Sequence, residues 1–318
     1  MAAKVQKQEA VALLEKQIAE LEKSAPSTAC LEEIQRLRQQ IEALREEFSR
    51  GQDAWARVLL ARHPQRPFTL DYIDLLFDDF QELHGDRTFA DDHALIGGMA
   101  HFEKQPVMVI GIQKGRDTKQ KVYRNFGMSR PEGYRKALRL MQLAAKFRRP
   151  IITLVDTPGA YPGIGAEERG QAEAIAHNLK EISKLPVPMV VLIHAEGGSG
   201  GALAIAVGDR VFMLENAIYS VISPESCSSI LWHDWEHKRE AAQILKLTAQ
   251  ELMALGLIHG LIPEPPGGAH TDYRKTAELI RPRLSSALKE LSALSEEQLL
   301  RERFKNLRAP GRFVQESG

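Results

Sequence analysis

Two glycine-rich segments stand where short apolar runs end, and they are the parts of this 318-residue sequence best suited to chemistry. The first, residues 157–163 (Thr-Pro-Gly-Ala-Tyr-Pro-Gly), follows the apolar run 151–155, and the second, residues 197–201 (Gly-Gly-Ser-Gly-Gly), follows the run 189–193. Glycine exposes backbone N–H groups with no Cβ in the way, and a helix that begins there adds positive dipole. Such donors stabilise an oxygen atom that gains negative charge, so each segment is predicted to be an oxyanion-stabilising loop.

Two such loops in one chain favour a chemical role over a packing role. Glycines after a strand often serve only close packing of a helix on a sheet, and either segment alone could have that explanation. Removal of one oxyanion donor in other enzymes costs about 3–4 kcal/mol of transition-state stabilisation. Two preorganised loops can therefore carry much of a reaction without a side-chain nucleophile.

A serine hydrolase is the main alternative, because Gly197-x-Ser199-x-Gly201 matches the G-x-S-x-G nucleophile elbow. The acid and base that it would need stand downstream in hydrolase order: Asp209 or Asp234, then His259 or His270. The four glycines around Ser199 exceed what an elbow needs, and an elbow leaves residues 156–163 unexplained.

Other chemistries have weaker signals. Residues 156–159 (Asp-Thr-Pro-Gly) resemble the D-x-x-G switch of GTPases, but no G-x-x-x-x-G-K-[ST] phosphate loop occurs in the sequence. Cys30 and Cys227 form no Cys-x-x-Cys pair, which argues against a disulfide framework and against a zinc site in this chain. His233 and His237 have a helical spacing that suits a metal, but no third ligand is near, so no metal site is expected here.

Composition narrows the class of protein. Lys+Arg and Asp+Glu both number 42, so there is no global basic field for nucleic acid or an anionic membrane. The sequence contains no run of 18 apolar residues, and its first residues lack the apolar core of a signal peptide. We expect a cytoplasmic protein without a membrane or nucleic-acid partner.

The elements that must position the glycine segments alternate along the chain. Apolar runs predict strands at 107–112, 151–155, 189–193, 211–214 and 219–222. Helical spacing predicts helices at 132–147 and 166–183, a short helix from Gly201, a helix that resumes after 63–67 through Phe80, and a helical tail from Leu245 that is interrupted at 263–268. This alternation predicts a largely parallel sheet with crossover helices.

The first fifty residues predict a helical hairpin. Their apolar side chains recur every three or four residues, at Val11, Leu14, Ile18 and Leu21 and then at Ile34, Leu37, Ile41, Leu44 and Phe48. Residues 24–28 break the pattern between the two helices. The hairpin could pack on the chain's own core or dock a partner subunit, and the sequence leaves both open.

Several strings in the sequence resemble the alpha subunits of acetyl-CoA carboxylase carboxyltransferases. Besides both glycine segments they are Ala-Arg-His-Pro-Gln-Arg-Pro at 61–67, Gly-Asp-Arg at 85–87, Gly-Met at 127–128, Pro-Glu-Gly-Tyr-Arg-Lys-Ala at 131–137, Ser-Val-Ile-Ser-Pro-Glu at 220–225 and Ile-Pro-Glu-Pro-Pro-Gly-Gly-Ala-His at 262–270. The resemblance covers about residues 55–270. The two ends of the chain and residues 232–246 look individual.

The resemblance implies an α/β fold of the crotonase-like (ClpP/crotonase) type, a spiral of ββα units with an N-terminal helical hairpin and C-terminal helices. Together with the helices expected at both ends, it divides the chain into three parts: a helical hairpin or docking arm at 1–54, a carboxyltransferase domain at 55–270 and a helical tail at 271–318. The family works with a beta subunit, expected in an α2β2 assembly, that carries a zinc ribbon and most of the acetyl-CoA site. The further partners are the biotin carboxyl carrier protein and biotin carboxylase.

The implied reaction moves a carboxyl group from carboxybiotin, held on the separate carrier, to acetyl-CoA and gives malonyl-CoA for fatty acid synthesis. Negative charge develops on the ureido oxygen of biotin and on a thioester oxygen, which suits backbone donors. The resemblance assigns the catalytic donors to Gly200, Gly201 and Gly198, and the biotin pocket to Gly159, Ala160, Gly163, Gly197 and Ser199. A basic group after a predicted strand could meet CoA phosphates or the carrier, or be a solvated loop: Lys114, Arg116, Lys119 and Lys121.

Overall fold

The computed structural model describes residues 53–311 throughout and, before them, only Leu14, Ile18, Leu21, residues 33–37 and residues 40–41. In this part of the chain one eight-stranded sheet has the order β1-β2-β3-β4-β5-β6-β8, with β7 paired to β5. The strands are β1 (Asp78–Glu82), β2 (Leu95–Phe102), β3 (Gln105–Ile112), β4 (Ile151–Thr157), β5 (Met189–Gly198), β6 (Arg210–Leu214), β7 (Ile218–Ser220) and β8 (Gly260–Ile262).

The sheet is antiparallel from β1 to β3 and parallel from β3 onward. All seven residues of β4 are buried, and so are the first nine residues of β5. Strands covered on both faces need apolar side chains on both sides, which explains the unbroken apolar runs in the sequence. The largely parallel sheet predicted from those runs is confirmed.

Three strands were not predicted. The helix expected through Phe80 ends at Leu76, and β1 comes after it as a mostly exposed edge strand. In β2, two adjacent glycines hide the strand pattern, and Gly98 is needed because a Cβ there would lie under 3.0 Å from the backbone of Gln81. Strand β8 has only three residues, in a tail that was expected to be helical.

The helices are α3 (Ala54–Ala61), α4 (Thr69–Leu76), α5 (Thr118–Tyr123), the 3-10 turn η1 (Asn125–Gly127), α6 (Pro131–Lys146), α7 (Ile164–Glu168), α8 (Gln171–Ile182), α9 (Ser199–Leu203), α10 (Pro224–Trp232), α11 (Lys238–Ile244), α12 (Ala249–Ala254), α13 (Tyr273–Ser292) and α14 (Glu296–Arg308). The helix expected at 166–183 is divided between α7 and α8, because Gly170 adopts a left-handed φ of 78°.

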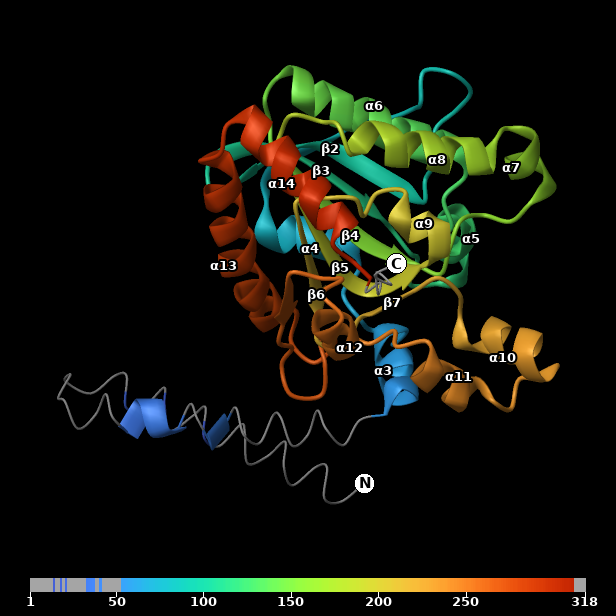
Figure 1. The fold of residues 1–318 in the computed structure, drawn as a ribbon, viewed down its shortest axis with the longest axis vertical. Helices are drawn as coiled ribbons and strands as arrows, with labels where there is room; N and C mark the ends of the chain where they lie inside the picture. Colours follow the sequence, from blue (N-terminus) through green and yellow to red (C-terminus); the bar gives the residue numbers. More distant parts are fainter. Residues whose placement is uncertain are drawn as a thin grey trace, which may run out of the picture.

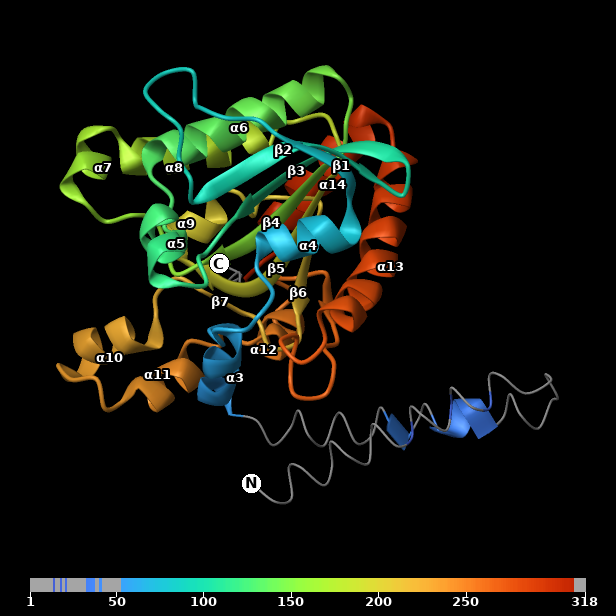
Figure 2. The same cartoon turned by 180° about the vertical axis from the view of Figure 1, so that it is seen from behind.

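The helices cover both faces of the sheet (Figures 1 and 2). A Cβ on Gly97 would meet Leu140 of α6, whereas a Cβ on Gly111 would meet Thr69 of α4. Since Gly97 pairs with Ile110 and Gly111 pairs with Ile96, the residue before Gly97, the two glycines face opposite sides. Helix α6 therefore lies on one face with α8, and α4 lies on the other with α13.

The C-terminal helices belong to the main core, because Leu284 and Leu288 of α13 and Leu299 of α14 are buried in the same apolar cluster as the sheet. Helices α10 and α11 pack on each other and α11 packs on α3, and the three project from the sheet in both views (Figures 1 and 2). No helix in the described part of the chain is long and apolar enough to cross a membrane.

The described residues of the N-terminal hairpin are helical, and their apolar side chains form a cluster of their own, separate from the main core. The cluster consists of Leu14, Ile18, Leu21, Ile34, Leu37 and Ile41. The break predicted at 24–28 lies outside the described residues. The domain boundaries at 54/55 and 270/271 stay predictions.

Candidate active site

The two glycine segments lie against each other, backbone to backbone. A Cβ on Gly198 would stand under 3.0 Å from the carbonyl group of Pro158, and a Cβ on Gly201 would stand under 3.0 Å from the backbone nitrogen of Ala160. Only glycine allows so close an approach of two main chains. The two segments, which are distant in the sequence, are therefore in direct contact.

A bulge in β5 brings the second segment up to the first. Val155 of β4 pairs with Ile193 of β5, but the next pair joins Thr157 to Gly197. One residue of β4, Asp156, therefore faces three residues of β5. Extra residues in one strand bend it and change the direction of the chain beyond them, and here the bulge turns β5 toward the end of β4.

The bulge in β5 is fixed by the side chain of Arg66. Arg66, which is 1% exposed, donates two hydrogen bonds of 2.9 and 2.7 Å to the carbonyl oxygen of His194. The same guanidinium donates at 2.9 and 2.5 Å to both oxygens of Glu264. Burial by itself would raise the pKa of Glu264, but Arg66 holds this pKa below its usual value, so the buried carboxylate stays charged.

Lys114 links the residues that immediately precede the two segments. Its Nζ lies 2.8 Å from Oδ1 of Asp156 and 3.0 Å from Oε2 of Glu196. Arg62 holds the other oxygen of Glu196 at 2.7 Å and reaches Glu225 at 2.6 Å. Burial opposes the charge of Glu196, but Lys114 and then Arg62 lower its pKa, whereas burial raises the pKa of Asp156.

The basic group of the sequence is therefore only partly free. Lys114 is committed to Asp156 and Glu196, and Arg116 pairs with Asp71 and donates to the hydroxyl of Tyr273 at 3.2 Å. Lys119 and Lys121 lie on α5, none of whose residues is buried. A phosphate or an acidic partner could be met by these two lysines, but the solvated-loop interpretation fails for Lys114.

The first glycine segment is fixed by residues 127–129. Thr157 donates through Oγ1 to the carbonyl oxygen of Gly127 at 2.6 Å, and the N–H of Tyr161 donates to the carbonyl oxygen of Ser129 at 3.0 Å. The N–H of Gly159 donates to Oγ1 of Thr157 at 3.0 Å. Gly159 therefore contributes to the shape of the loop, and its N–H already has a partner.

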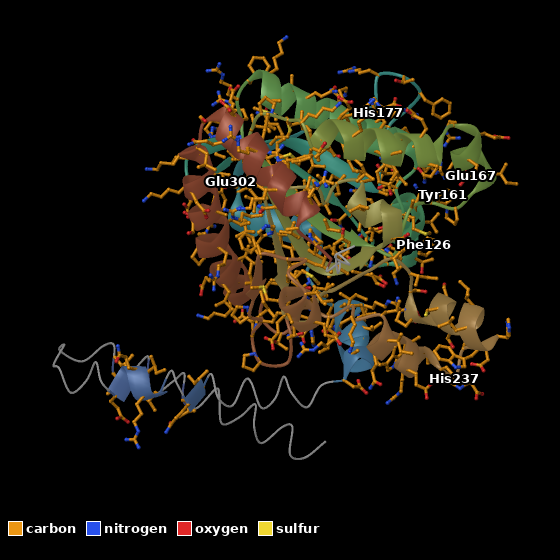
Figure 3. The ribbon with its side chains drawn as sticks, in the orientation of Figure 1. Phe126, Tyr161, Glu167, His177, His237 and Glu302 are labelled. Carbon is orange, nitrogen blue, oxygen red and sulfur yellow. The ribbon has the colours of Figure 1, made fainter. Side chains whose placement is uncertain are left out.

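Gly163 makes room for an aromatic ring, because a Cβ there would lie under 3.0 Å from the ring of Tyr161. The guanidinium of Arg130 packs over the same ring, 4.8 Å from the ring centroid. Figure 3 shows Tyr161 and Phe126 on the side of the molecule where α5, α7 and α9 gather. Gly163 thus allows the ring of Tyr161 to pack against the backbone of the first segment.

The second glycine segment differs from its prediction in one respect. Gly197 and Gly198 complete β5, and α9 begins at Ser199 rather than at Gly201 and has only five residues. Ser199 is exposed and has a left-handed φ of 52°. The N–H groups of Ser199, Gly200 and Gly201 belong to the first turn of α9, where no acceptor lies within the helix.

An apolar groove of about 670 Å³ adjoins these donors. It is lined by Ser199, Gly200, Leu203, Ala206, Val207, Gly208, Val211, Tyr219, Ser220, Val221, Leu245, Leu252, Gly256, Leu257, His259, Asn306, Leu307, Ala309 and Pro310. A smaller cavity of about 240 Å³ lies on the side of Lys114 and Asp156 and includes Lys121 and Phe126. The site combines backbone donors, an apolar wall and buried charge.

The triad of a serine hydrolase is not assembled. The four residues that it would need have other partners: Asp209 pairs with Arg303, His259 accepts from the N–H of Val211, Asp234 bonds His237, and His270 stacks on His63. No hydrogen bond among the described residues joins any of them to Ser199. The elbow motif marks a glycine-shaped turn here.

The histidine pair does not share a helix, contrary to its spacing. His233 ends α10 with a left-handed φ of 62°, and His237 precedes α11. Within residues 53–311 and the described N-terminal positions, no group of three or more His, Cys, Asp or Glu could hold a metal ion. Cys227 is a buried free thiol, and Cys30 lies outside the described residues.

Comparisons with known proteins agree with the geometry. A family model described as "Acetyl co-enzyme A carboxylase carboxyltransferase-like" matches residues 4–311. The acetyl-coenzyme A carboxylase carboxyl transferase subunit alpha of Geobacter metallireducens is 57% identical over 303 residues, 95% of each chain. The subunit of the same name from Bordetella avium is 56% identical over 287 residues, 90% of this chain and 89% of the other.

Solved structures show the fold. The transcarboxylase 12S structure matches with a TM-score of 0.56 and 19% identity over 78% of this chain, which spans 43% of the transcarboxylase chain. A Pseudomonas malonate decarboxylase hetero-dimer matches with a TM-score of 0.56 and 17% identity, covering 68% of this chain and 88% of the other. The crotonase-like α/β fold that the resemblance implied is confirmed.

Proposed function

This chain belongs to the acetyl-CoA carboxylase carboxyltransferase family, as a subunit of the alpha type, and we propose that its two glycine segments form the half of the active site that holds the ureido group of biotin. The family's enzymes are biotin-dependent transferases that form malonyl-CoA. The observation that carries the proposal is the backbone contact of Gly198 with Pro158 and of Gly201 with Ala160. It places the N–H groups at the start of α9 against the backbone of the first segment.

The reaction needs donors more than it needs a titratable side chain. The N–C bond of carboxybiotin breaks, CO2 departs and the bonding electrons stay on the ureido group as an anion. That anion takes a proton from the methyl group of acetyl-CoA, and the resulting enolate attacks CO2 to give malonyl-CoA. Preorganised N–H groups stabilise the ureido oxygen as its charge grows and do little for the neutral ring.

Within the segments we assign different tasks to the glycines. Gly200, whose N–H is at the second position of α9, donates to the ureido oxygen. Gly198 and Gly201 allow the close approach that aims this donor. The first segment contributes the wall through Ala160 and, by way of Tyr161, through Gly163.

The apolar groove is suited to biotin. Its volume of about 670 Å³ and its lining of Leu, Val and Ala side chains suit an apolar bicycle and its alkyl arm, with Ser199 and Gly200 as the polar contacts. The carboxyl group is delivered as carboxybiotin on a separate carrier protein, which biotin carboxylase would recharge.

The remaining half of the site is assigned to a partner. We propose a beta subunit, in an α2β2 assembly, that supplies a zinc ribbon and most of the acetyl-CoA site. The exposed Lys119 and Lys121 would meet CoA phosphates or the carrier, and residues 1–54 would serve as a docking arm. The cytoplasmic location expected from the sequence is part of the proposal.

A reconstitution tests the assignment. The purified chain alone should form no malonyl-CoA from acetyl-CoA and carboxylated carrier, and addition of the beta subunit should start the reaction, monitored by liquid chromatography of the CoA thioesters. Omission of the carrier should stop it. Robust turnover by the single chain would contradict the two-subunit proposal.

A further inference from the structure

We infer that Lys114 is a positioning residue, which sets the gap between the two glycine segments by bridging the carboxylates that stand directly before them. The inference rests on the proposed function, since it gives the gap between the segments its importance. It concerns a partly buried lysine, and no hydrogen bond within residues 53–311 joins it to the glycine segments themselves.

The bridge acts where the segments begin. Asp156 directly precedes Thr157 of the first segment, and Glu196 directly precedes Gly197 of the second. Lys114 Nζ lies 2.8 Å from the carboxylate of Asp156 and 3.0 Å from that of Glu196, so it ties β4 to β5 at the bulge. A shift of its ammonium group would move both segments relative to each other.

The stem of the lysine is fixed as well as its head. A Cβ on Gly127 would lie 2.6 Å from Cγ of Lys114, so only the bare backbone of Gly127 admits the stem. The carbonyl oxygen of that same Gly127 accepts the hydroxyl of Thr157 at 2.6 Å. The peptide that confines the lysine therefore also anchors the first segment.

The other charges near the bridge cannot replace it. Arg62 holds Glu196 and Glu225, and Arg66 holds the carbonyl of His194. Among the described residues, no other cation forms an ion pair with both carboxylates of the bulge. The side chains of Asp156 and Glu196 are 2% and 8% exposed. Because both carboxylates are buried and contact the same ammonium group, they repel each other when this cation is removed.

Amide hydrogen exchange of the full chain tests the inference without any activity. Lys114→Met keeps the length of the stem and removes the charge, and it should speed exchange at residues 159–163 and 197–201 by about tenfold or more. Arg303→Met is the matched control, because Arg303 is a buried cation paired with Asp209. Because this variant lowers the stability of the whole fold, it should speed exchange over the sheet in general, with nothing particular to the two segments. Equal rates in Lys114→Met and the unaltered chain would overturn the inference.

A conservative variant and a second site guard against a failure to fold. Lys114→Arg keeps a cation between the carboxylates and should restore slow exchange at least in part. If Lys114→Met does not fold, Asp156→Asn, which keeps an acceptor for Lys114, should produce the same pattern with a smaller size. Faster exchange spread evenly over the sheet, with nothing particular to the two segments, would assign Lys114 a purely structural role.

Kinetics of the complete two-subunit enzyme give the second readout. A displacement of about 1 Å in a reacting geometry costs on the order of 100-fold in rate, so Lys114→Met should lower kcat by about that factor. The KM for acetyl-CoA should change less than about twofold, because that substrate is expected to bind elsewhere. An inactive unaltered complex would count against the proposed function and leave the exchange result standing, whereas full kcat in Lys114→Met would refute the positioning role.

Discussion

Strand β5 has a buried ion-pair network at each of its ends, and the two networks do different work. At its start, the N–H of Met189 donates to Asp209, whose carboxylate pairs with Arg303 of α14. At its end, Glu196 pairs with Lys114 and Arg62. Arg303 and Asp209 are fully buried, and the network at the end of β5 borders a cavity that includes Lys114 and Arg62.

The network at the start of β5 is closed. Besides Asp209, the guanidinium of Arg303 donates to three carbonyl oxygens on the chain that leads into β5: Ile182, Leu185 and Val187. All of these hydrogen bonds join α14 to the chain around the start of β5. The network at the end of β5 is open, because it borders the cavity, and its charges stand next to the glycine backbone of the two segments. The same kind of interaction thus fastens a helix at one end and sets the spacing of two backbones at the other.

The largest expected effect is on stability and comes from the closed end. Arg303→Met leaves the carboxylate of Asp209 buried without its cation, and loss of one partner of such a pair costs about 3–5 kcal/mol. Urea unfolding monitored by circular dichroism should show this loss. The kcat of the folded two-subunit enzyme should stay the same. A large fall in kcat without a fall in stability would break the division between the two ends.

The next effect is on activity and comes from the open end. Gly201→Ala forces a Cβ against the backbone of Gly159 and Ala160, which must move away. A separation of about 1 Å should lower kcat roughly 100-fold, measured as malonyl-CoA formed by the reconstituted enzyme.

Gly98→Ala is the control for Gly201→Ala. A Cβ there would lie under 3.0 Å from the carbonyl oxygen of Gln81 and from Cα of Glu82, so it also crowds backbone, but between β1 and β2 at the edge of the sheet. This variant should lose stability and keep the kcat of its folded fraction. Equal activity losses in the two variants would mean that backbone crowding anywhere in the sheet is sufficient.

The sequence predicts the closed and the open end unequally. The strands β3 to β6 and both glycine segments can be predicted from apolar runs and from glycine, because these patterns are local. The contact between the segments depends on the bulge in β5, and the spacing of residues 189–201 contains no sign of it. The one signal in the sequence is the placement of Asp156 and Glu196, two acidic residues that directly precede the glycine segments.

Ion pairs between residues that are far apart in the sequence cannot be predicted from local patterns. Lys114 was placed in a solvated or phosphate-binding loop because the nearby Arg116, Lys119 and Lys121 look like a basic surface patch. Its carboxylate partners are more than 40 residues away, and nothing in a single sequence connects them. Arg303 was missed for the same reason, since the other charged residues of α14 are exposed.

The smallest expected effect is a pH dependence that belongs to the open end. Burial raises the pKa of Asp92 to about 6, although the N–H groups of Ala94 and Arg130 donate to it. The carboxylate of Asp92 accepts from the N–H of Arg130, the residue after Ser129, and the carbonyl oxygen of Ser129 accepts from the N–H of Tyr161. Asp92 therefore helps to fix the first segment. Since the folded chain binds this proton more tightly than the unfolded chain, stability should fall as pH rises from about 4.5 to 6, by roughly 1.5 kcal/mol.

Urea unfolding across this range should show that slope in the unaltered chain and in Arg303→Met, and a flatter one in Asp92→Asn. An unchanged slope in Asp92→Asn would assign the titration to another group and remove this difference between the two ends.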